Sequence, residues 1–265
     1  MSMRKAFGRP CGNFLRRWND GRTIKAPGRH PGGDVAALPD DRLIAEFSLW
    51  SADLVRMAED VARVDDFVDI YHADVADGHF SPAMLLFPDL ITQLRPLTGK
   101  PIHVHLMVAD GALADQIDQF AEAGADIISI HAENGDPETA LDRIGARGVA
   151  AGMVLQLHTP VASAARWLDR LSMLTLLGTR MGIKGVGLDP AAEPRLVEAR
   201  RMIDDRATGH QKTRVLLAAD GGIREHTVPG LRRSGADTIV MGSLAFGAGD
   251  LAGRMAWVHA QPGPA

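Results

Sequence analysis

The chain has little cysteine, no long apolar run and no excess of basic charge, and each absence excludes a class of protein. One cysteine, Cys11, stands among 265 residues, which excludes an internal disulfide and a zinc cluster of cysteines and suits a reducing cytosol. No apolar run approaches the ~20 residues that a membrane span needs. A net charge of -4 gives no general affinity for nucleic acid or anionic membranes. We therefore expect a cytoplasmic protein without a nucleic-acid or membrane partner.

Residues 1–40 differ from the rest because they are rich in Arg, Gly and Pro and lack a sustained hydrophobic period. They contain no apolar core of the kind that a secretory signal has. We expect a disordered or peripheral extension, or a misassigned start; an ordered arm used in oligomer contacts is the alternative. Residues 261–265 have the composition of a tail. The sequence thus predicts one domain over residues 41–260.

From residue 42 onward, short apolar runs alternate with amphipathic stretches. The runs are almost continuously hydrophobic, which favours parallel strands buried on both faces. We predict a single (β/α)8 TIM barrel, a fold that commonly fills a chain of this length. An open doubly wound sheet is the alternative, but no Gly-rich dinucleotide motif follows the first strand. The predicted strands are residues 43–48, 67–74, 102–107, 127–131, 150–155, 173–177, 215–219 and 238–241.

Helix signals separate these strands. Ser51 is the expected N-cap of a helix that carries apolar residues from 54 to 64. Gly124 is the expected stop of a helix that carries Ile117 and Phe120. Further helical patterns lie at residues 167–168, 196–203 and 228–231.

Histidine and aspartate gather at predicted strand ends, where the loops of a barrel frame the active site. His72 and Asp74 lie two apart on one strand, so they face the same side; His103 and His105 repeat this spacing on the next strand. Asp220 ends the seventh strand. A single histidine is more often a hydrogen-bonded core residue than a ligand, but unpaired carboxylates inside a barrel are costly. The combination favours a bound cation.

Glycines follow the last two strands. Gly221 and Gly222 come directly after Asp220, and glycine lets backbone amides approach a ligand closely. Gly242 and Ser243 follow the eighth strand in the same way. Because the loops after strands 7 and 8 are the usual phosphate site of this fold, we predict a phosphate cradle there.

Five motifs together resemble the ribulose-phosphate 3-epimerase family, and they occur in the family's order from about residue 44 to residue 246. They are SLWSADL (48–54), HADVADGHFSP (72–82), VHLMV (104–108), ADGGI (219–223) and GADTIVMGSLAF (235–246). Each motif is modest alone, and together they are specific to the family.

The resemblance implies an isomerase that inverts a ketose phosphate by a two-base 1,1-proton transfer through a cis-enediolate. Asp74 and Asp220 would be the acid/base pair, with D-ribulose 5-phosphate and D-xylulose 5-phosphate as default substrates. His72, Asp74, His105 and Asp220 would bind one divalent metal ion, zinc before iron, manganese or cobalt. A homo-oligomer, either dimer or hexamer, is also implied. The implied substrate-binding residues are Ser48, Met107, Gly182, Lys184, Gly185, Gly221, Gly222, Gly242 and Ser243.

The departures from the family pattern cluster around the substrate and spare the metal ligands. Lys184 replaces a glycine of a phosphate loop; it could bind an anion or remain solvated, and Arg180 raises the same question. His103 replaces an aspartate, and Gln156 and Leu157 replace Asn-Pro. Further family residues are replaced by Phe47, Ala76, Ala83 and Leu177. Three alternatives follow: an epimerase of a tetrulose or hexulose phosphate such as allulose 6-phosphate, a barrel aldolase or decarboxylase, and a non-catalytic sugar-phosphate-binding protein.

Overall fold

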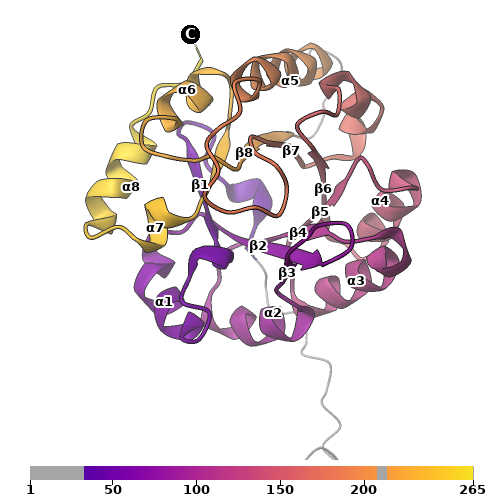
Figure 1. The fold of residues 1–265 in the computed structure, drawn as a ribbon, viewed down its shortest axis with the longest axis horizontal. Helices are drawn as coiled ribbons and strands as arrows, with labels where there is room; N and C mark the ends of the chain where they lie inside the picture. Colours follow the sequence, from indigo (N-terminus) through magenta and orange to yellow (C-terminus); the bar gives the residue numbers. More distant parts are fainter. Residues whose placement is uncertain (1–32, 208–213, 265) are drawn as a thin grey trace, which may run out of the picture. The chain divides into compact units, whose positions relative to one another are not determined.

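Eight parallel strands close into a barrel in the computed structural model, which describes residues 33–207 and 214–264 (Figure 1). Each strand pairs in parallel with the next, and β1 pairs with both β2 and β9, which closes the barrel. The predicted (β/α)8 barrel is therefore confirmed. The parallel strands are β1 (Ile44–Ser48), β2 (Ile70–Asp77), β4 (Ile102–Met107), β5 (Ile127–His131), β6 (Ala150–Leu155), β7 (Met173–Leu177), β8 (Leu216–Asp220) and β9 (Thr238–Met241).

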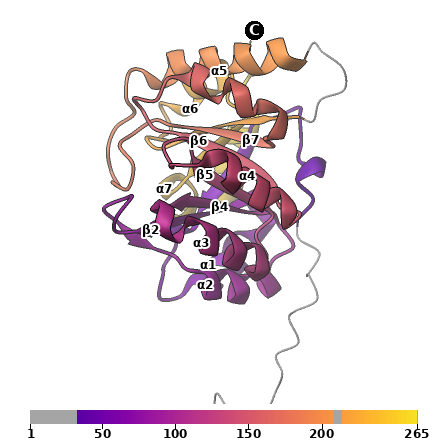
Figure 2. The same ribbon diagram turned by 90° about the vertical axis from the view of Figure 1, so that its right-hand side faces the viewer.

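Helices surround the barrel in both views (Figures 1 and 2). Among the described helices, none combines the length and the hydropathy that crossing a bilayer requires. The α-helices are α1 (Met57–Val64), α2 (Pro88–Leu94), α3 (Asp110–Ala123), α4 (Pro137–Ala146), α5 (Ala192–Ala207), α6 (Val228–Arg233), α7 (Ser243–Phe246) and α8 (Leu251–His259). The 3-10 segments are η1 (Val35–Ala37), η2 (Leu49–Ser51), η3 (Asp65–Phe67), η4 (Arg95–Leu97) and η5 (Val161–Arg170).

The prediction for where one helix ends is confirmed, and the prediction for where another helix begins is wrong. Gly124 ends α3 with a left-handed φ of 105°, as predicted. Ser51 is not the N-cap of α1: it ends η2, and α1 begins at Met57 after Arg56. Hydrogen bonds to side chains hold the residues before Met57 in a loop. The Asp53 carboxylate accepts from the Val55 N–H, and the Asp53 N–H donates to the Asp60 carboxylate at 2.7 Å.

The second strand also differs from its prediction. Phe67 belongs to η3, so the strand starts at Ile70 and not at residue 67. It continues to Asp77 because a two-residue strand, β3 (Met84–Leu85), pairs with its end in antiparallel fashion. The seventh parallel strand, β8, includes Asp220 as its last residue.

Alternate residues of the strands face the barrel axis and form layers. The lowest layer is apolar and buried, and it consists of Ile44, Ile70, Ile127, Met173 and Leu216. Two residues further along β1, β2, β5 and β7 lie Glu46, His72, Ser129 and Thr175, which form a fully buried polar layer together with His103 and Thr238. The next layer, at the C-terminal mouth, holds Ser48, Asp74, His105 and Asp220.

Part of the predicted extension contacts the lower end of the barrel. Val35 and Leu38 pack against the apolar layer, and the Arg214 guanidinium donates to the carbonyl of Leu38 at 3.1 Å. Residues 1–32, with Cys11, lie outside the described residues, as does residue 265. Residues 261–264 have no regular secondary structure.

Candidate metal centre and active site

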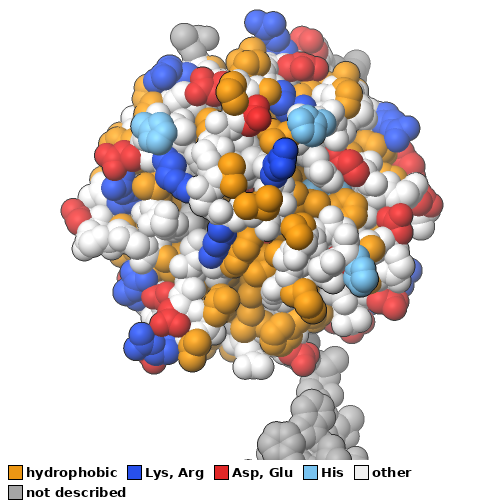
Figure 3. Space-filling view, viewed as in Figure 1, with side chains coloured by type: hydrophobic (Ala, Val, Ile, Leu, Met, Phe, Trp, Pro, Cys, Tyr) orange, Lys and Arg blue, Asp and Glu red, His pale blue; other side chains and the backbone are white. Residues whose placement is uncertain are grey.

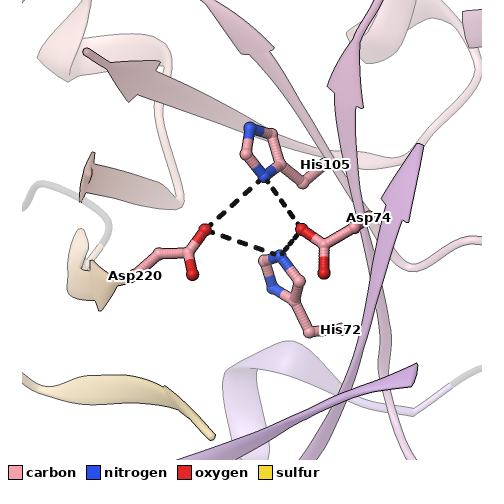
Figure 4. A group of neighbouring side chains, drawn as sticks. All are labelled: His72, Asp74, His105 and Asp220. Atoms are coloured by element: carbon pink, nitrogen blue, oxygen red, sulfur yellow. Dashed lines mark ion pairs between the residues drawn. The ribbon is translucent and has the colours of Figure 1, made fainter. Parts of the chain in front are cut away.

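Four side chains from three strands converge at the mouth of the barrel (Figure 4). Strand β2 supplies His72 and Asp74, β4 supplies His105, and β8 supplies Asp220. Asp74 Oδ1 lies 3.3 Å from His72 Nε2 and 3.5 Å from His105 Nδ1. Asp220 Oδ2 lies 3.6 Å from His105 Nδ1 and 4.0 Å from His72 Nε2. A tetrahedral zinc site with bonds of about 2.0–2.2 Å spaces its ligand atoms about 3.3–3.6 Å apart.

The two imidazole nitrogens that face the carboxylates are buried and have no hydrogen-bond partner among the described residues. The other nitrogen of each ring has a hydrogen-bond partner. His72 Nδ1 lies 2.9 Å from Glu46 Oε2, and His105 Nε2 lies 2.8 Å from His131 Nε2. Buried polar atoms without a partner are costly, so these two nitrogens with two carboxylates fit a divalent cation.

The hydrogen bonds behind His105 determine which of its two ring nitrogens carries the proton. Burial lowers the pKa of His131 to about 4, so this ring is neutral at pH 7. Its Nδ1–H donates to the Glu133 carboxylate at 3.1 Å, which leaves Nε2 as an acceptor for the Nε2–H of His105. The Nδ1 lone pair of His105 therefore points at Asp74 and Asp220. A carboxylate behind a ligand histidine commonly orients the ring in this way.

The two aspartates differ in proton affinity. Burial favours the neutral acid for both. His72 and His105 outweigh burial at Asp74 and hold its pKa well below its usual range. At Asp220, burial and the charge of Asp74 outweigh the histidines and raise the pKa to about 6. At His72, burial lowers the pKa, but Asp74 and Glu46 hold it well above its usual value. The cluster thus has one ionised carboxylate and one that takes a proton near pH 6.

A cavity of about 120 Å³ opens above the cluster, lined by Asp74, His105 and Asp220. Ser48 donates a hydrogen bond to Asp74 Oδ2 at 2.8 Å. The Lys184 ammonium reaches from the loop after β7 to the carbonyl of Trp50 and lies 4.8 Å from the centre of the Trp50 ring. The predicted substrate residues in the lining are Ser48, Met107, Lys184, Gly185, Gly221, Gly222 and Gly242.

The backbone conformation and the close packing at positions 221 and 222 both require glycine. Their φ values are 88° and 72°, in the left-handed region that favours glycine. A Cβ at Gly221 would lie 2.4 Å from Thr179 Oγ1, and one at Gly222 would lie 2.7 Å from Leu188 Cα. The glycines therefore let the loop after β7 pack directly against the loop after β8, which together form one wall of the cavity.

Some predicted substrate residues lie apart from this cavity. Gly182 packs against Ser81 and Pro82, where a Cβ would lie 2.2 Å from Ser81 Oγ. Ser243 is exposed at the start of α7. Among the altered family positions, Leu177 lines the cavity, whereas Ala76 lines a separate apolar groove.

Sequence reasoning missed several residues that the fold brings to the site. Trp50, Thr179, Met181 and Arg224 line the cavity; Trp50 lies in the short η2 segment and the other three lie on loops, so none has a periodic signal. For Glu46, the sequence does contain a pattern that predicts a role at the site. Glu46 is a carboxylate in the middle of the apolar strand Ile44–Ser48, all of whose residues are buried, and such a charge needs partners.

Sequence comparison finds relatives across most of the chain. A family model described as the ribulose-phosphate 3 epimerase family matches residues 44–246. The ribulose-phosphate 3-epimerase of Bacillus subtilis (strain 168) is 34% identical over 206 residues, 77% of this chain and 92% of the relative. The ribulose-phosphate 3-epimerase of Escherichia coli (strain K12) is 33% identical over 204 residues, 75% of this chain and 87% of the relative.

Solved structures with other activities share the fold. Orotidine 5'-phosphate decarboxylase from Pyrococcus horikoshii OT3 matches with a TM-score of 0.56 and 15% identity, over 81% of this chain and 97% of that one. A 3-hexulose-6-phosphate synthase matches with a TM-score of 0.57 and 16% identity, over 82% and 98%. At these identities the likeness shows the barrel fold alone.

Proposed function

The chain belongs to the ribulose-phosphate 3-epimerase family, and from this premise we propose that it is a metal-dependent ketose-phosphate 3-epimerase. Membership makes it an isomerase that acts on carbohydrates. The default reaction interconverts D-ribulose 5-phosphate and D-xylulose 5-phosphate. The observation that carries the proposal is that two carboxylates, of buried Asp74 and half-buried Asp220, meet from different strands beside two histidine nitrogens.

Asp74 and Asp220 are the proposed acid/base pair. They enter the cluster from opposite sides in Figure 4, as inversion of one carbon requires. Asp74, the ionised carboxylate, removes the C3 proton next to the ketose carbonyl, which leaves an enediolate. Asp220, whose pKa is raised to about 6, delivers a proton to the opposite face. The roles exchange in the reverse direction, and carboxylates whose proton affinities differ suit this division.

One divalent metal ion per chain is part of the proposal, with zinc expected before iron, manganese or cobalt. His72 Nε2, His105 Nδ1 and one oxygen each of Asp74 and Asp220 would hold it, a donor set of two nitrogens and two oxygens that suits these metals. When bound, such an ion supplies stabilisation of negative charge on the substrate oxygens. Metal analysis of the purified protein should find about one ion per chain.

The substrate side of the pocket favours a phosphorylated sugar. Gly221, Gly222, Gly242 and Ser243 are the proposed phosphate contacts at the loops after β8 and β9, with Lys184 as a cation beside them. Ser48, Met107, Gly182 and Gly185 complete the proposed substrate set. Because Leu177 and Lys184 alter the lining, a tetrulose or hexulose phosphate such as allulose 6-phosphate is the alternative substrate.

Proton exchange in deuterated water tests the proposal. The protein is incubated with ribulose 5-phosphate and with a series of other ketose phosphates, and deuterium at C3 is followed by NMR. We expect exchange together with formation of the C3 epimer. Exchange without epimer would contradict the two-base scheme. Cleavage of a carbon–carbon bond would favour a barrel aldolase or decarboxylase, and binding without exchange would favour a sugar-phosphate-binding protein.

A homo-oligomer, either dimer or hexamer, is also proposed. A groove of about 560 Å³ is lined by residues of α1, α2, α3 and β3, most of them apolar. Figure 3 shows apolar side chains gathered there, and the lining residues Met84 and Phe87 are 82% and 58% exposed. Exposed apolar patches commonly mark protein interfaces. Light scattering on the purified chain measures the assembly state.

A cytoplasmic location is also proposed, because a chain with a single cysteine suits a reducing compartment.

A further inference from the structure

Glu46 is a buried carboxylate one layer below the metal centre, and the two-base chemistry leaves it without a role. Its side chain is 0% exposed. It sits on β1, and the β1–β2 register pairs it with Ile70, two residues before His72. An ionised carboxylate in such a place costs several kcal/mol unless it is fully hydrogen-bonded, so its partners are informative.

Three donors satisfy Glu46. His72 Nδ1 lies 2.9 Å and His103 Nδ1 2.7 Å from Oε2, and Thr238 Oγ1 lies 2.8 Å from Oε1. Both oxygens of this fully buried side chain therefore have partners at 2.7–2.9 Å. A carboxylate oxygen accepts hydrogen bonds, and Oε2 faces both rings, so both Nδ1 atoms carry their protons.

His103 is held in the same way from its other side. Its Nε2 lies 2.7 Å from Ser129 Oγ, and because Nδ1 carries the proton of the neutral ring, Nε2 accepts from the hydroxyl. The neighbouring strand makes room for this hydroxyl, since a Cβ at Gly152 would lie 1.9 Å from Ser129 Oγ. Five strands, β9, β1, β2, β4 and β5, thus contribute to one network that includes His72.

We infer that Glu46 is a positioning residue that fixes the Nδ1–H tautomer and the ring orientation of His72, so that Nε2 faces the metal. The inference rests on the metal site of the proposed function. Sequence motifs of the family carry an aspartate where this chain has His103. His103 pairs with His72 on adjacent strands, so a carboxylate at position 103 would lie beside the same ring, and in this chain His103 instead holds the Glu46 carboxylate.

The test measures metal binding and not activity alone. Full-length protein freed of metal is titrated with Co²⁺, followed by visible absorption, in competition with a chelator. Glu46→Gln keeps the shape and one acceptor oxygen, and it should weaken Co²⁺ binding about tenfold; Glu46→Ala should weaken it about a hundredfold, the range found when a group behind a metal ligand is lost. Nitrogen-15 NMR of the histidines should show a mixed tautomer for His72 in Glu46→Ala.

Two further variants separate positioning from general support of the barrel. Thr175→Val alters the same buried layer at a hydroxyl without a hydrogen-bond partner among the described residues, and it should bind Co²⁺ like the parent chain. Glu46→Ala combined with His103→Asp returns the carboxylate to β4 and should recover most of the affinity. Should Glu46→Ala fail to fold, Glu46→Gln decides.

Several results would overturn the inference: unchanged Co²⁺ affinity in folded Glu46→Gln, equal weakening by Thr175→Val, or no recovery in the folded double variant. The parent chain keeps this separate from the proposed function. If the parent binds no Co²⁺ or exchanges no C3 proton with any ketose phosphate, the proposed function fails; if it does both and Glu46→Gln matches it, only the role of Glu46 fails.

Discussion

The pocket has two sides that the fold builds differently. The metal side, made of His72, Asp74, His105 and Asp220, is carried by strands; buried Glu46 supports His72 from behind, and Glu133 supports His105 through His131. The substrate side lies on the loops after β7, β8 and β9, and its one lysine, Lys184, is exposed. Strand-borne groups with locked hydrogen bonds are held in place, whereas loop-borne groups can change without disturbing the barrel. The four metal-ligand positions keep the family's residues, whereas Lys184 on the loop after β7 and Leu177 at the end of β7 depart from them.

The largest expected effect comes from breaking the metal side at its acid/base pair. Asp74→Asn and Asp220→Asn should each lower C3 proton exchange by on the order of 10³-fold or more, because neither amide can take or deliver the proton. Asp115→Asn, on the exposed face of α3, is the matched control and should exchange normally. Persistence of exchange in either active-site variant with normal metal content would contradict the two-base scheme.

The second-largest expected effect is a loss of metal affinity at low pH. The pKa of His72 is held well above its usual value and that of Asp220 is raised to about 6, so protons compete with the metal for His72 already near neutral pH and for Asp220 as well below about pH 6. Since a ligand must lose its proton to bind, affinity should fall about tenfold per pH unit for each proton displaced. Metal titrations between pH 5 and pH 8 measure this slope, and an affinity independent of pH would contradict the assignment of these ligands.

A smaller effect is expected on the substrate side at Lys184. Lys184→Ala should raise KM for a ketose phosphate about tenfold and leave kcat nearly unchanged, as expected when one hydrogen bond to a charged group is lost. Arg180→Ala is the matched control, because Arg180 is exposed on the same loop outside the cavity lining. Equal KM values for Lys184→Ala and the parent would show that Lys184 contacts only Trp50.

The smallest effect is expected at Leu177, which lines the cavity where the family has methionine. Leu177→Met conserves volume and should change stability by less than about 1.5 kcal/mol. If the lining selects the sugar, this variant should shift the ratio of kcat/KM between ribulose 5-phosphate and longer ketose phosphates by a few fold. Parallel assays with both substrates measure the ratio, and thermal melting checks the stability.

Several features of this protein could be predicted from sequence alone because they depend on local periodicity and on motif identity. Apolar runs of strand length marked all eight parallel strands, with errors of a few residues such as the start of β2. The spacing of His72 and Asp74 placed both on one side of a strand, since side chains alternate with period two. The convergence of these two residues with His105 and Asp220 followed from the common C-terminal edge of a parallel barrel.

Only the tertiary structure decided which strands and loops face one another. The bonds from Glu46 to His72 and His103 join β1, β2 and β4, residues 26 and 57 positions apart, and no local pattern encodes such a pairing. The same holds for Lys184, which reaches Trp50 across 134 positions, and for β3, which lengthens β2. Periodicity specifies the face that a side chain takes, whereas barrel closure and long-range register set its partners, because those contacts form only when distant segments pack together.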